Sequence, residues 1–264
     1  MRFLIPVLLA LLLPSTTASA CGPETDCTIA ERTYRIAMPD NPVRGALIHM
    51  HGYRGSAKGV MRNKALRSLA NEMGLALIAP KSRGDDWDIP GVPANPVSDG
   101  KAEIAFFDAL LDQAVDQHGI PGDRMYASGF SAGGMMTWNL ACERGSRFAG
   151  FIPIAGTFWA PVPAECPDIG AHMVHIHGLS DRIVPLGGRP IRTTHQGDVP
   201  TALTLFAAGG ETDNERSFQP DLTCTDYDLT KPRSLSFCTH PGGHSIRMDY
   251  LRAAFTILRD RGAF

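Results

Sequence analysis

Residues 124–143 have the sequence RMYASGFSAGGMMTWNLACE, which carries the strongest indication of the fold class. Its first five residues have the composition of a short buried strand, and residues 135–143 have the pattern of a helix. Between them, residues 129–133 form a G-x-S-x-G sequence in the strand–turn–helix context that this motif requires. Such a turn projects the hydroxyl of Ser131 above the sheet edge and leaves the backbone N–H of Ala132 at the start of a helix. The alternative is a glycine-rich turn in which Ser131 only caps the helix.

Apolar segments alternate with helical patterns on both sides of this stretch. Strands are expected at 45–50, 75–80, 124–128, 151–155, 173–177 and 234–238, and helices at 60–73, 135–143 and 246–258. A further helix is expected with Ser98 as its N-cap, an apolar face of Ile104, Phe107, Leu111 and Val115, and its end at Gly119 and Pro121. Residues 80–95 are interrupted by glycine and proline, which predicts a long loop. The alternation predicts an α/β fold, a single domain with a mostly parallel central sheet flanked by helices.

The first 20 residues have the features of a signal peptide. Arg2 precedes an apolar run at 3–13, and residues 18–20 match an A-x-A cleavage site. The run is shorter than the roughly 20 residues that cross a bilayer, and no later segment is apolar for long enough to do so. We therefore predict a signal peptide at 1–20, a mature domain at 21–264 without a membrane span, and a secreted or periplasmic location.

The charge balance argues against a nucleic-acid partner. The chain has 25 Lys and Arg residues against 27 Asp and Glu residues, and without Arg2 the mature chain has 24 against 27, a net charge of −3. Nucleic-acid-binding domains carry a basic excess. With 44% hydrophobic and 20% charged residues, the composition is that of an ordinary globular protein.

Six cysteines lie in the predicted mature chain, and an even count in an exported protein indicates three disulfides. The most local of the fifteen possible pairings is Cys21–Cys27, Cys142–Cys166 and Cys224–Cys238. Lipidation of Cys21 is an alternative. It is disfavoured because Ala18 stands where a leucine is usual and because it would leave one cysteine unpaired.

A nucleophilic serine needs a base, and the base needs an acid that orients it. Asp181 follows an expected strand end 50 residues after Ser131, and His244 follows the last expected strand. Both positions are loops at the carboxyl ends of strands, where α/β sheets collect their sites. The alternatives are a turn or cap role for Asp181, and His240 as the base in place of His244.

Four further residues are candidates for contacts with a substrate. The turn at 51–55 offers the backbone N–H of Tyr53 as a second donor to an oxyanion, beside that of Ala132. Trp87 in the expected long loop and Trp159 just past a strand end are candidates for a substrate groove. Met135, which follows the G-x-S-x-G turn at 129–133 (the elbow), is a further candidate. Tryptophans of this kind are more often part of the core.

These motifs together resemble the secreted polyhydroxybutyrate depolymerase and feruloyl esterase group of α/β-hydrolases. The similarity covers H-G-x-x-G at 51–55, G-x-S-A-G-G at 129–134, H-G-x-x-D-x-x-V-P at 177–185 and G-G-H at 242–244. It implies an ester hydrolase with Ser131 as nucleophile, Asp181 as acid and His244 as base. Two positions differ from the group, because Ser245 follows the histidine where Trp-Pro is frequent, and Tyr53 stands where cysteine is frequent. Both lie near the acyl or leaving group of the substrate.

Two other classes of function compete with this interpretation. The H-x-H pairs His49/His51 and His175/His177 place two rings on one face of a strand, as some metal sites do. The second class is a non-catalytic binding protein on a hydrolase scaffold. We expect a serine esterase without metal or cofactor, acting on a small or polymeric ester. The sequence does not indicate an oligomeric state.

Overall fold

The G-x-S-x-G turn lies at the carboxyl end of a central strand in a large sheet. The computed structural model describes residues 21–170, 172–227, 229 and 233–264. The expected signal peptide at 1–20 lies outside these residues. Within them, no helix combines the length and the apolar character needed to cross a membrane.

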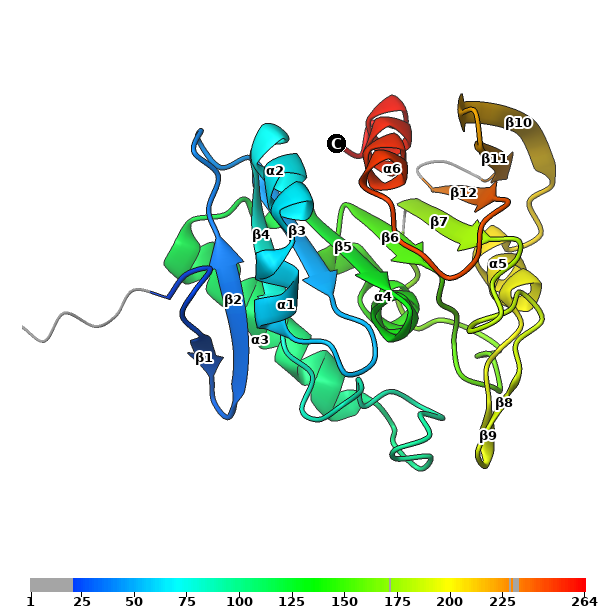
Figure 1. The fold of residues 1–264 in the computed structure, drawn as a ribbon, viewed down its shortest axis with the longest axis horizontal. Helices are drawn as coiled ribbons and strands as arrows, with labels where there is room; N and C mark the ends of the chain where they lie inside the picture. Colours follow the sequence, from blue (N-terminus) through cyan, green and yellow to red (C-terminus); the bar gives the residue numbers. More distant parts are fainter. Residues whose placement is uncertain (1–20, 171, 228, 230–232) are drawn as a thin grey trace, which may run out of the picture.

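Ten strands of the described chain form one sheet in the order β1-β2-β4-β3-β5-β6-β7-β12-β11-β10 (Figure 1). The strands are β1 (Cys27–Ile29), β2 (Arg32–Ala37), β3 (Gly45–Met50), β4 (Leu75–Pro80), β5 (Met125–Phe130), β6 (Gly150–Ile154), β7 (His172–Gly178), β10 (Thr212–Gln219), β11 (Leu222–Tyr227) and β12 (Ser234–His240). Neighbouring strands pair in parallel from β4 to β12, and the strands at the two edges pair antiparallel. The prediction of a mostly parallel central sheet is confirmed.

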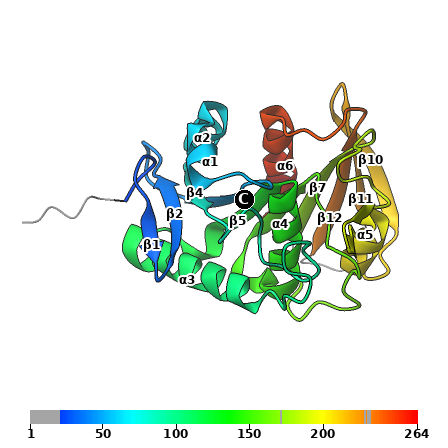
Figure 2. The same ribbon diagram turned by 60° about the horizontal axis from the view of Figure 1, so that its bottom comes forward.

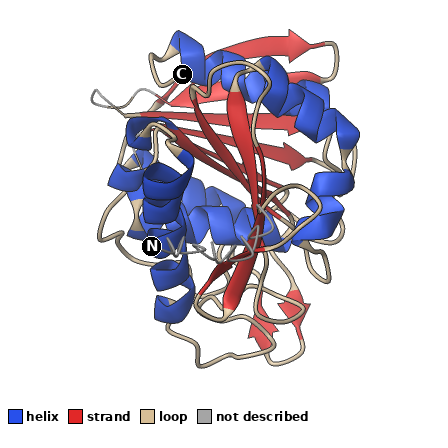
Figure 3. Cartoon of the chain, turned by 90° about the vertical axis from the view of Figure 1, so that its left-hand side faces the viewer, coloured by secondary structure: helices blue, strands red, loops and turns tan. Residues whose placement is uncertain are grey.

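Helices cover both faces of the sheet (Figure 2, Figure 3). One face carries α1 (Ala57–Arg62), α2 (Lys64–Glu72) and α6 (Met248–Asp260), and the other carries α3 (Lys101–His118), α4 (Ala132–Glu143) and α5 (Val199–Ala207). Each face has its own buried apolar cluster. Because both faces are covered, β3 and β4 are buried along their whole length, which explains their continuous apolar sequences.

The expected helix at 60–73 is two helices in the structure. α1 ends at Arg62 and α2 begins at Lys64. Asn63 between them is extended, with φ −73° and ψ 93°, and its side chain accepts a hydrogen bond from the N–H of Leu66 at 3.1 Å. The polar side chain therefore ends one helix and caps the next, which an apolar periodicity does not reveal.

The expected start of α3 is also wrong by two residues. The N-cap is Gly100, which has a left-handed φ of 70°, and the Ser98 hydroxyl accepts a hydrogen bond from the N–H of Gly100 at 3.1 Å. Ile104, Phe107 and Leu111 are buried as expected, but Val115 is 41% exposed. The expected end at Gly119 is confirmed, because Gly119 is the C-cap with a φ of 64°.

The elements that the sequence did not predict lie mainly at the two edges of the sheet. These are the hairpin β1–β2, the hairpin β10–β11, the helix α5, the short pair β8 (Pro190–Ile191) and β9 (Thr194–His195), and the 3₁₀ turns Gly122–Arg124 and Gly145–Arg147. Edge strands are partly exposed, so their sequences alternate or are polar and give a weaker signal than buried strands.

The expected disulfide pairing is confirmed. The bonds are Cys21–Cys27, Cys142–Cys166 and Cys224–Cys238, and no cysteine is free. Cys224 and Cys238 are directly opposite each other on β11 and β12, so this bond joins the antiparallel edge to the parallel part of the sheet. Cys142 lies near the end of α4, so the second bond ties this helix to the long loop that follows β6.

Candidate active site

Ser131 lies at the turn between β5 and α4 in a backbone conformation that serine rarely adopts, with φ 59° and ψ −121°. The N–H of Ser131 donates to the carbonyl of Ile154 at 2.9 Å, which ties the turn to β6. A Cβ at Gly129 would lie 2.2 Å from the carbonyl oxygen of Gly133, and one at Gly133 would lie 2.1 Å from that of Met50. Only glycine fits at these two positions. The surrounding backbone therefore maintains the strain at Ser131, as is common at functional sites.

Two backbone N–H groups are available close to Ser131. Ala132 is the first residue of α4, so its N–H has no acceptor within the helix. On the other side, a Cβ at Gly52 would lie 3.5 Å from the Cβ of Ser131, so the segment after β3 passes directly beside the serine. In this segment, Arg54 N–H donates to Asp85 and Gly55 N–H to Gly52, while the N–H of Tyr53 has no acceptor among the described residues. Both expected oxyanion donors are thus unoccupied and near the elbow.

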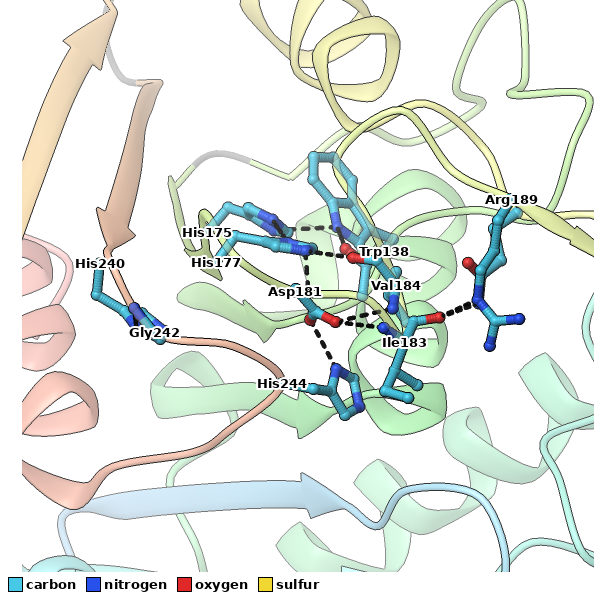
Figure 4. Close-up of polar contacts among 12 residues, drawn as sticks. Trp138, His175, His177, Asp181, Ile183, Val184, Arg189, His240, Gly242 and His244 are labelled. Carbon is cyan, nitrogen blue, oxygen red and sulfur yellow. Dashed lines mark hydrogen bonds and ion pairs between the residues drawn. The ribbon is translucent and has the colours of Figure 1, made fainter.

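Asp181 is buried at the end of β7, and its two carboxylate oxygens have different partners (Figure 4). Oδ1 accepts from the backbone N–H groups of Ile183 at 2.8 Å and Val184 at 2.9 Å. Oδ2 lies 2.7 Å from Nδ1 of His244. Burial raises the pKa of Asp181, but these hydrogen bonds together outweigh it, and the resulting pKa lies below the ordinary value. The carboxylate therefore stays charged.

His244 reaches Asp181 from the loop after β12. Its ring packs on Phe130, the residue before Ser131, with ring centroids 4.6 Å apart, and its side chain is 15% exposed. Among the described residues, the Ser131 hydroxyl has no hydrogen-bond partner. The structure thus joins Asp181 to His244 directly and brings His244 next to the elbow, while the serine and histidine are not yet hydrogen-bonded. Such contacts often tighten only when substrate binds.

His240, the competing base, has other neighbours. Its ring packs on Tyr250 with centroids 5.0 Å apart, and its Nδ1 accepts from the N–H of Gly242 at 3.2 Å. The side chain is buried, and burial lowers the pKa of this imidazole. Figure 4 shows His240 beside Gly242, whereas His244 is the imidazole that contacts Asp181.

A chain of buried hydrogen bonds, which the sequence did not predict, leads from α4 to the loop that carries Asp181 (Figure 4). Trp138 Nε1 donates to His175 Nδ1 at 3.2 Å, and His175 Nε2 lies 3.0 Å from His177 Nδ1. His177 Nε2 lies 2.7 Å from the carbonyl of Val184 and 3.6 Å from Oδ2 of Asp181. Because Trp138 can only donate, each histidine accepts at Nδ1 and donates from Nε2. The chain thus holds the loop that presents Asp181.

Both rings in this chain are neutral. Burial, followed by repulsion from His177, lowers the pKa of His175 well below its ordinary value. Burial also lowers the pKa of His177, against the opposing effects of the Val184 carbonyl and Asp181. Neither ring therefore forms a charged pair with Asp181, whose negative charge remains available to stabilise a charged His244.

The other H-x-H pair holds the loops around β3. His49 Nδ1 lies 2.7 Å from the hydroxyl of Ser128 on β5, and His51 Nε2 accepts from the N–H of Ser82 at 3.2 Å. His51 Nδ1 lies 2.9 Å from the carbonyl of Gly52. Both pairs therefore use ring nitrogens for contacts within the protein, which favours a structural role over metal ligation. In the described residues, the single cluster with metal-ligand spacing is Cys21, Cys27 and His118, and its two cysteines are joined in a disulfide.

Trp87 does not line a groove, so this expectation is wrong. Its side chain is fully buried, at 0% exposed, and its Nε1 donates to the carbonyl of His51 at 2.9 Å. Its ring packs against those of His51 and Phe107, with centroids 4.9 and 5.8 Å apart. Trp87 therefore holds the turn after β3 through this hydrogen bond and belongs to the core.

A pocket of about 330 Å³ lies beside Ser131. Trp159 and Met135 line it, as expected, together with Tyr53 and Val184. Arg189, Arg192, Gln196 and Asp86 also line this pocket, and the sequence did not predict their positions. They come from loops without a recognisable motif, so no pattern in the sequence could have brought them to the serine.

Three comparisons identify proteins similar to this chain. The model of the phospholipase/carboxylesterase family matches residues 31–192. NocK of Nocardia uniformis subsp. tsuyamanensis, which is named as a candidate esterase, is 30% identical, and the match covers 88% of this chain and 75% of that protein. Feruloyl esterase C of Emericella nidulans is 25% identical, with 91% of this chain and 90% of that protein covered.

The comparison of structures agrees with the fold. The acetyl xylan esterase from Aspergillus awamori superimposes with a TM-score of 0.61 at 16% identity, over 88% of this chain and 98% of that chain. At this identity the similarity shows the fold alone. The family match includes Ser131 and Asp181 within its 31–192 range and stops before His244. The chain belongs to the phospholipase/carboxylesterase family of α/β-hydrolases, and it is a carboxylic ester hydrolase.

Proposed function

We propose that this protein is a serine esterase with Ser131 as nucleophile, His244 as general base and Asp181 as the acid that orients the base. The observation that carries the proposal is the 2.7 Å contact between Asp181 Oδ2 and His244 Nδ1 beside the strained elbow at Ser131. With Nδ1–H bound to the carboxylate, the Nε2 lone pair is the atom of His244 that can take a proton. The backbone N–H groups of Tyr53 and Ala132 are the oxyanion donors in this proposal.

The reaction begins with acylation of the serine. His244 Nε2 takes the hydroxyl proton of Ser131 while Oγ forms a bond to the ester carbonyl carbon. The carbonyl oxygen becomes an oxyanion, which accepts hydrogen bonds from Tyr53 and Ala132. When the tetrahedral intermediate collapses, the C–O bond to the alcohol breaks, and His244 returns the proton to the leaving alkoxide.

Deacylation repeats these steps with water. His244 takes a proton from water as its oxygen attacks the acyl carbon, and the second intermediate expels Ser131 Oγ, which regains the proton. Asp181 stabilises the imidazolium in both halves and is not itself protonated. The products are the free acid and the alcohol.

The proposed substrates are hydroxyalkanoate esters, or esters of the feruloyl and acetyl type. Esterases named for feruloyl and acetyl xylan substrates are among the similar proteins. Trp159 and Met135 in the pocket offer apolar contact for an acyl chain or an aromatic ring. A panel of p-nitrophenyl esters, methyl ferulate and 3-hydroxybutyrate oligomers distinguishes among these classes.

The proposed location is outside the cytoplasm, through an N-terminal signal peptide at 1–20. The three disulfides support an oxidising compartment, because cytosolic proteins keep their thiols reduced. An N-terminal sequence of the exported protein that starts at Cys21 would support this location and the predicted boundary.

The triad is tested by replacing Ser131 and each candidate base. Ser131→Ala and His244→Ala should each lower kcat by about 10⁴-fold or more, because the members of a triad act as a unit. His240→Ala is the matched control, since this ring is buried against Tyr250 and does not contact Asp181. Activity is measured on a short-chain p-nitrophenyl ester, with circular dichroism to establish that each variant folds.

The same set of proteins separates the competing functions. Labelling of Ser131 by a fluorophosphonate probe should be lost in Ser131→Ala and unaffected by EDTA. Loss of turnover on treatment with EDTA would instead favour the metal-dependent alternative. Retained turnover in Ser131→Ala, or a loss in His240→Ala equal to that in His244→Ala, would contradict the assigned roles.

A further inference from the structure

Two arginines line the pocket that contains Ser131. Arg189 and Arg192 come from the loop between the acid Asp181 and the helix α5, on either side of the short strand β8. The rest of the lining is largely apolar, with Met135, Trp159 and Ile191 as examples. A guanidinium has five N–H donors and stays charged under all physiological conditions. The ester pocket therefore combines an apolar surface with two permanent positive charges.

Arg189 is held in place by the loop that presents the catalytic acid (Figure 4). Its Nε donates to the carbonyl of Ile183 at 2.7 Å, and the N–H of Ile183 donates to Oδ1 of Asp181 at 2.8 Å. This contact uses one of the five donors. In the described part of the chain, the terminal nitrogens of Arg189 have no hydrogen-bond or ion-pair partner. The guanidinium is thus held through Nε, while its two terminal nitrogens are available to a ligand.

Arg192 lies at the turn between β8 and β9, with a left-handed φ of 53°. The strand pairs Ile191–Thr194 and Pro190–His195 close this turn. Its guanidinium is exposed and has no ion pair or hydrogen bond with any described residue. Other arginines of the chain, such as Arg32, Arg144 and Arg247, form ion pairs with carboxylates. Exposed arginines elsewhere in the described chain, such as Arg62 and Arg83, have no such partner either, so Arg189 and Arg192 are distinguished by their place in the lining of the pocket beside Ser131.

The acidic residue in the pocket lining, Asp86, offsets only part of this positive charge. Burial raises the pKa of Asp86 to about 6, and repulsion from Asp85 and Glu103 adds to this effect. Asp86 accepts a hydrogen bond from the N–H of Trp87 at 2.9 Å and forms no ion pair with either arginine. Near neutral pH Asp86 is mostly ionised, so the pocket lining carries two guanidinium charges against one carboxylate and keeps a net positive charge.

We propose that the pocket selects esters that carry a carboxylate, which Arg189 and Arg192 bind while the ester group lies at Ser131. This inference rests on the proposed esterase function and adds its substrate class. Arginine pairs with carboxylates through two parallel hydrogen bonds, and such contacts are about twice as strong as those between neutral groups. The carboxylate can belong to the acid part of the ester or to its alcohol part, and the two cases are separated by the choice of substrate.

The test compares matched anionic and neutral esters. For the acid part, the pair is the mono-4-nitrophenyl ester of glutaric acid and its methyl ester at the free carboxylate. For the alcohol part, the pair is 3-acetoxybenzoate and methyl 3-acetoxybenzoate, followed by release of acetate. In the wild type, kcat/KM should favour the anionic member of at least one pair by about tenfold, mainly through a lower KM. Added salt should reduce this preference.

The variants assign the preference to the two arginines. Arg192→Gln should lower the anionic-to-neutral ratio about threefold, and Arg189→Gln with Arg192→Gln should abolish the preference. Arg62→Gln, at an exposed arginine near the end of α1 and outside the pocket, is the control for a change in net charge. No hydrogen bond or ion pair joins Arg192 to the described residues of the acid loop, whereas Arg189 donates to Ile183, so the Arg192 variant remains informative even where the loss of Arg189 disturbs that loop.

A wild-type ratio near one in both pairs, or a ratio that is unchanged in the Arg192→Gln variant, would overturn the proposal. Failure of the underlying esterase function gives a different result. In that case the neutral esters would not be hydrolysed at all, or Ser131→Ala would hydrolyse them as fast as the wild type.

Discussion

Strands β3 and β7 end in the same short pattern, but the two strand ends have different tasks. The sequence His49-Met50-His51-Gly52 spans the end of β3, which stops at Met50, and β7 contains His175-Ile176-His177-Gly178. Both are parallel strands, and they lie on opposite sides of β5, which leads to Ser131. The loop after β3 provides the N–H of Tyr53, and the loop after β7 provides Asp181. Each pair thus supports one half of the proposed site.

The hydrogen bonds of the two pairs differ. In the β3 pair, the rings diverge: His49 contacts Ser128 on the neighbouring strand, while His51 contacts the backbone of residues 52 and 82. In the β7 pair, the rings are joined to each other, and the chain ends beside Asp181. The first pair holds a neighbouring strand and the turn after β3, whereas the second holds the loop that carries Asp181. An identical local pattern therefore does not determine what a buried histidine does.

The largest effect is expected at the carboxylate of Asp181, in the loop after β7. Asp181→Asn should lower kcat by about 10⁴-fold, because an amide neither orients the imidazole nor stabilises its charged form. Asp168→Asn is the control: Asp168 accepts from the N–H and the hydroxyl of Ser146 at the surface and lies away from the pocket. Steady-state kinetics on a short-chain ester measures both. Equal losses in the two variants would mean that Asp181 is not the acid.

A smaller effect is expected at His177, the histidine of the hydrogen-bonded chain that lies nearest to Asp181. His177→Leu removes the donor to the Val184 carbonyl and leaves this loop less well fixed. We expect kcat to fall about 10- to 100-fold with KM little changed, as for residues that orient a catalytic group. His177→Gln keeps a donor and should recover part of the loss. If the leucine variant instead raises KM at unchanged kcat, then His177 shapes the pocket and does not position Asp181.

The smallest effect on turnover is expected at His49, where stability and not catalysis should change with pH. Burial, followed by repulsion from His51, lowers the pKa of His49 from 6.5 to about 4. The unfolded chain therefore binds more protons than the folded one in this range, so the protein loses stability as pH falls from about 6.5 to about 4. His49→Gln should reduce that loss by up to about 3 kcal/mol.

Denaturant unfolding of both proteins at pH 7 and at pH 4 measures this difference, and turnover at pH 7 should remain within a few-fold of the wild type. The same loss of stability on acidification in both proteins would show that His49 is not one of the groups responsible.

Much of the fold follows from local sequence patterns, because the central strands and the elbow are specified by neighbouring residues. The strand at 45–50 is predicted to the residue, and the elbow lies where its motif requires. The edge strands were missed, since a half-exposed strand has little apolar signal. The helix α5 was missed as well. Asn63 and Gly100 set helix boundaries through single hydrogen-bond and backbone properties that periodicity does not report.

The fold class, the nucleophile turn and the candidates Ser131, Asp181 and His244 all followed from local sequence, because each depends on short motifs at strand ends. The disulfide pairing also agreed with the most local arrangement. Only the tertiary structure decided that His244 contacts Asp181 while His240 packs on Tyr250, and that Trp87 is core while Trp159 lines the pocket. It also brought Arg189 and Arg192 to the pocket beside Ser131. The physical reason is that these roles depend on hydrogen bonds and burial between segments far apart in the chain, and no local pattern encodes such distances.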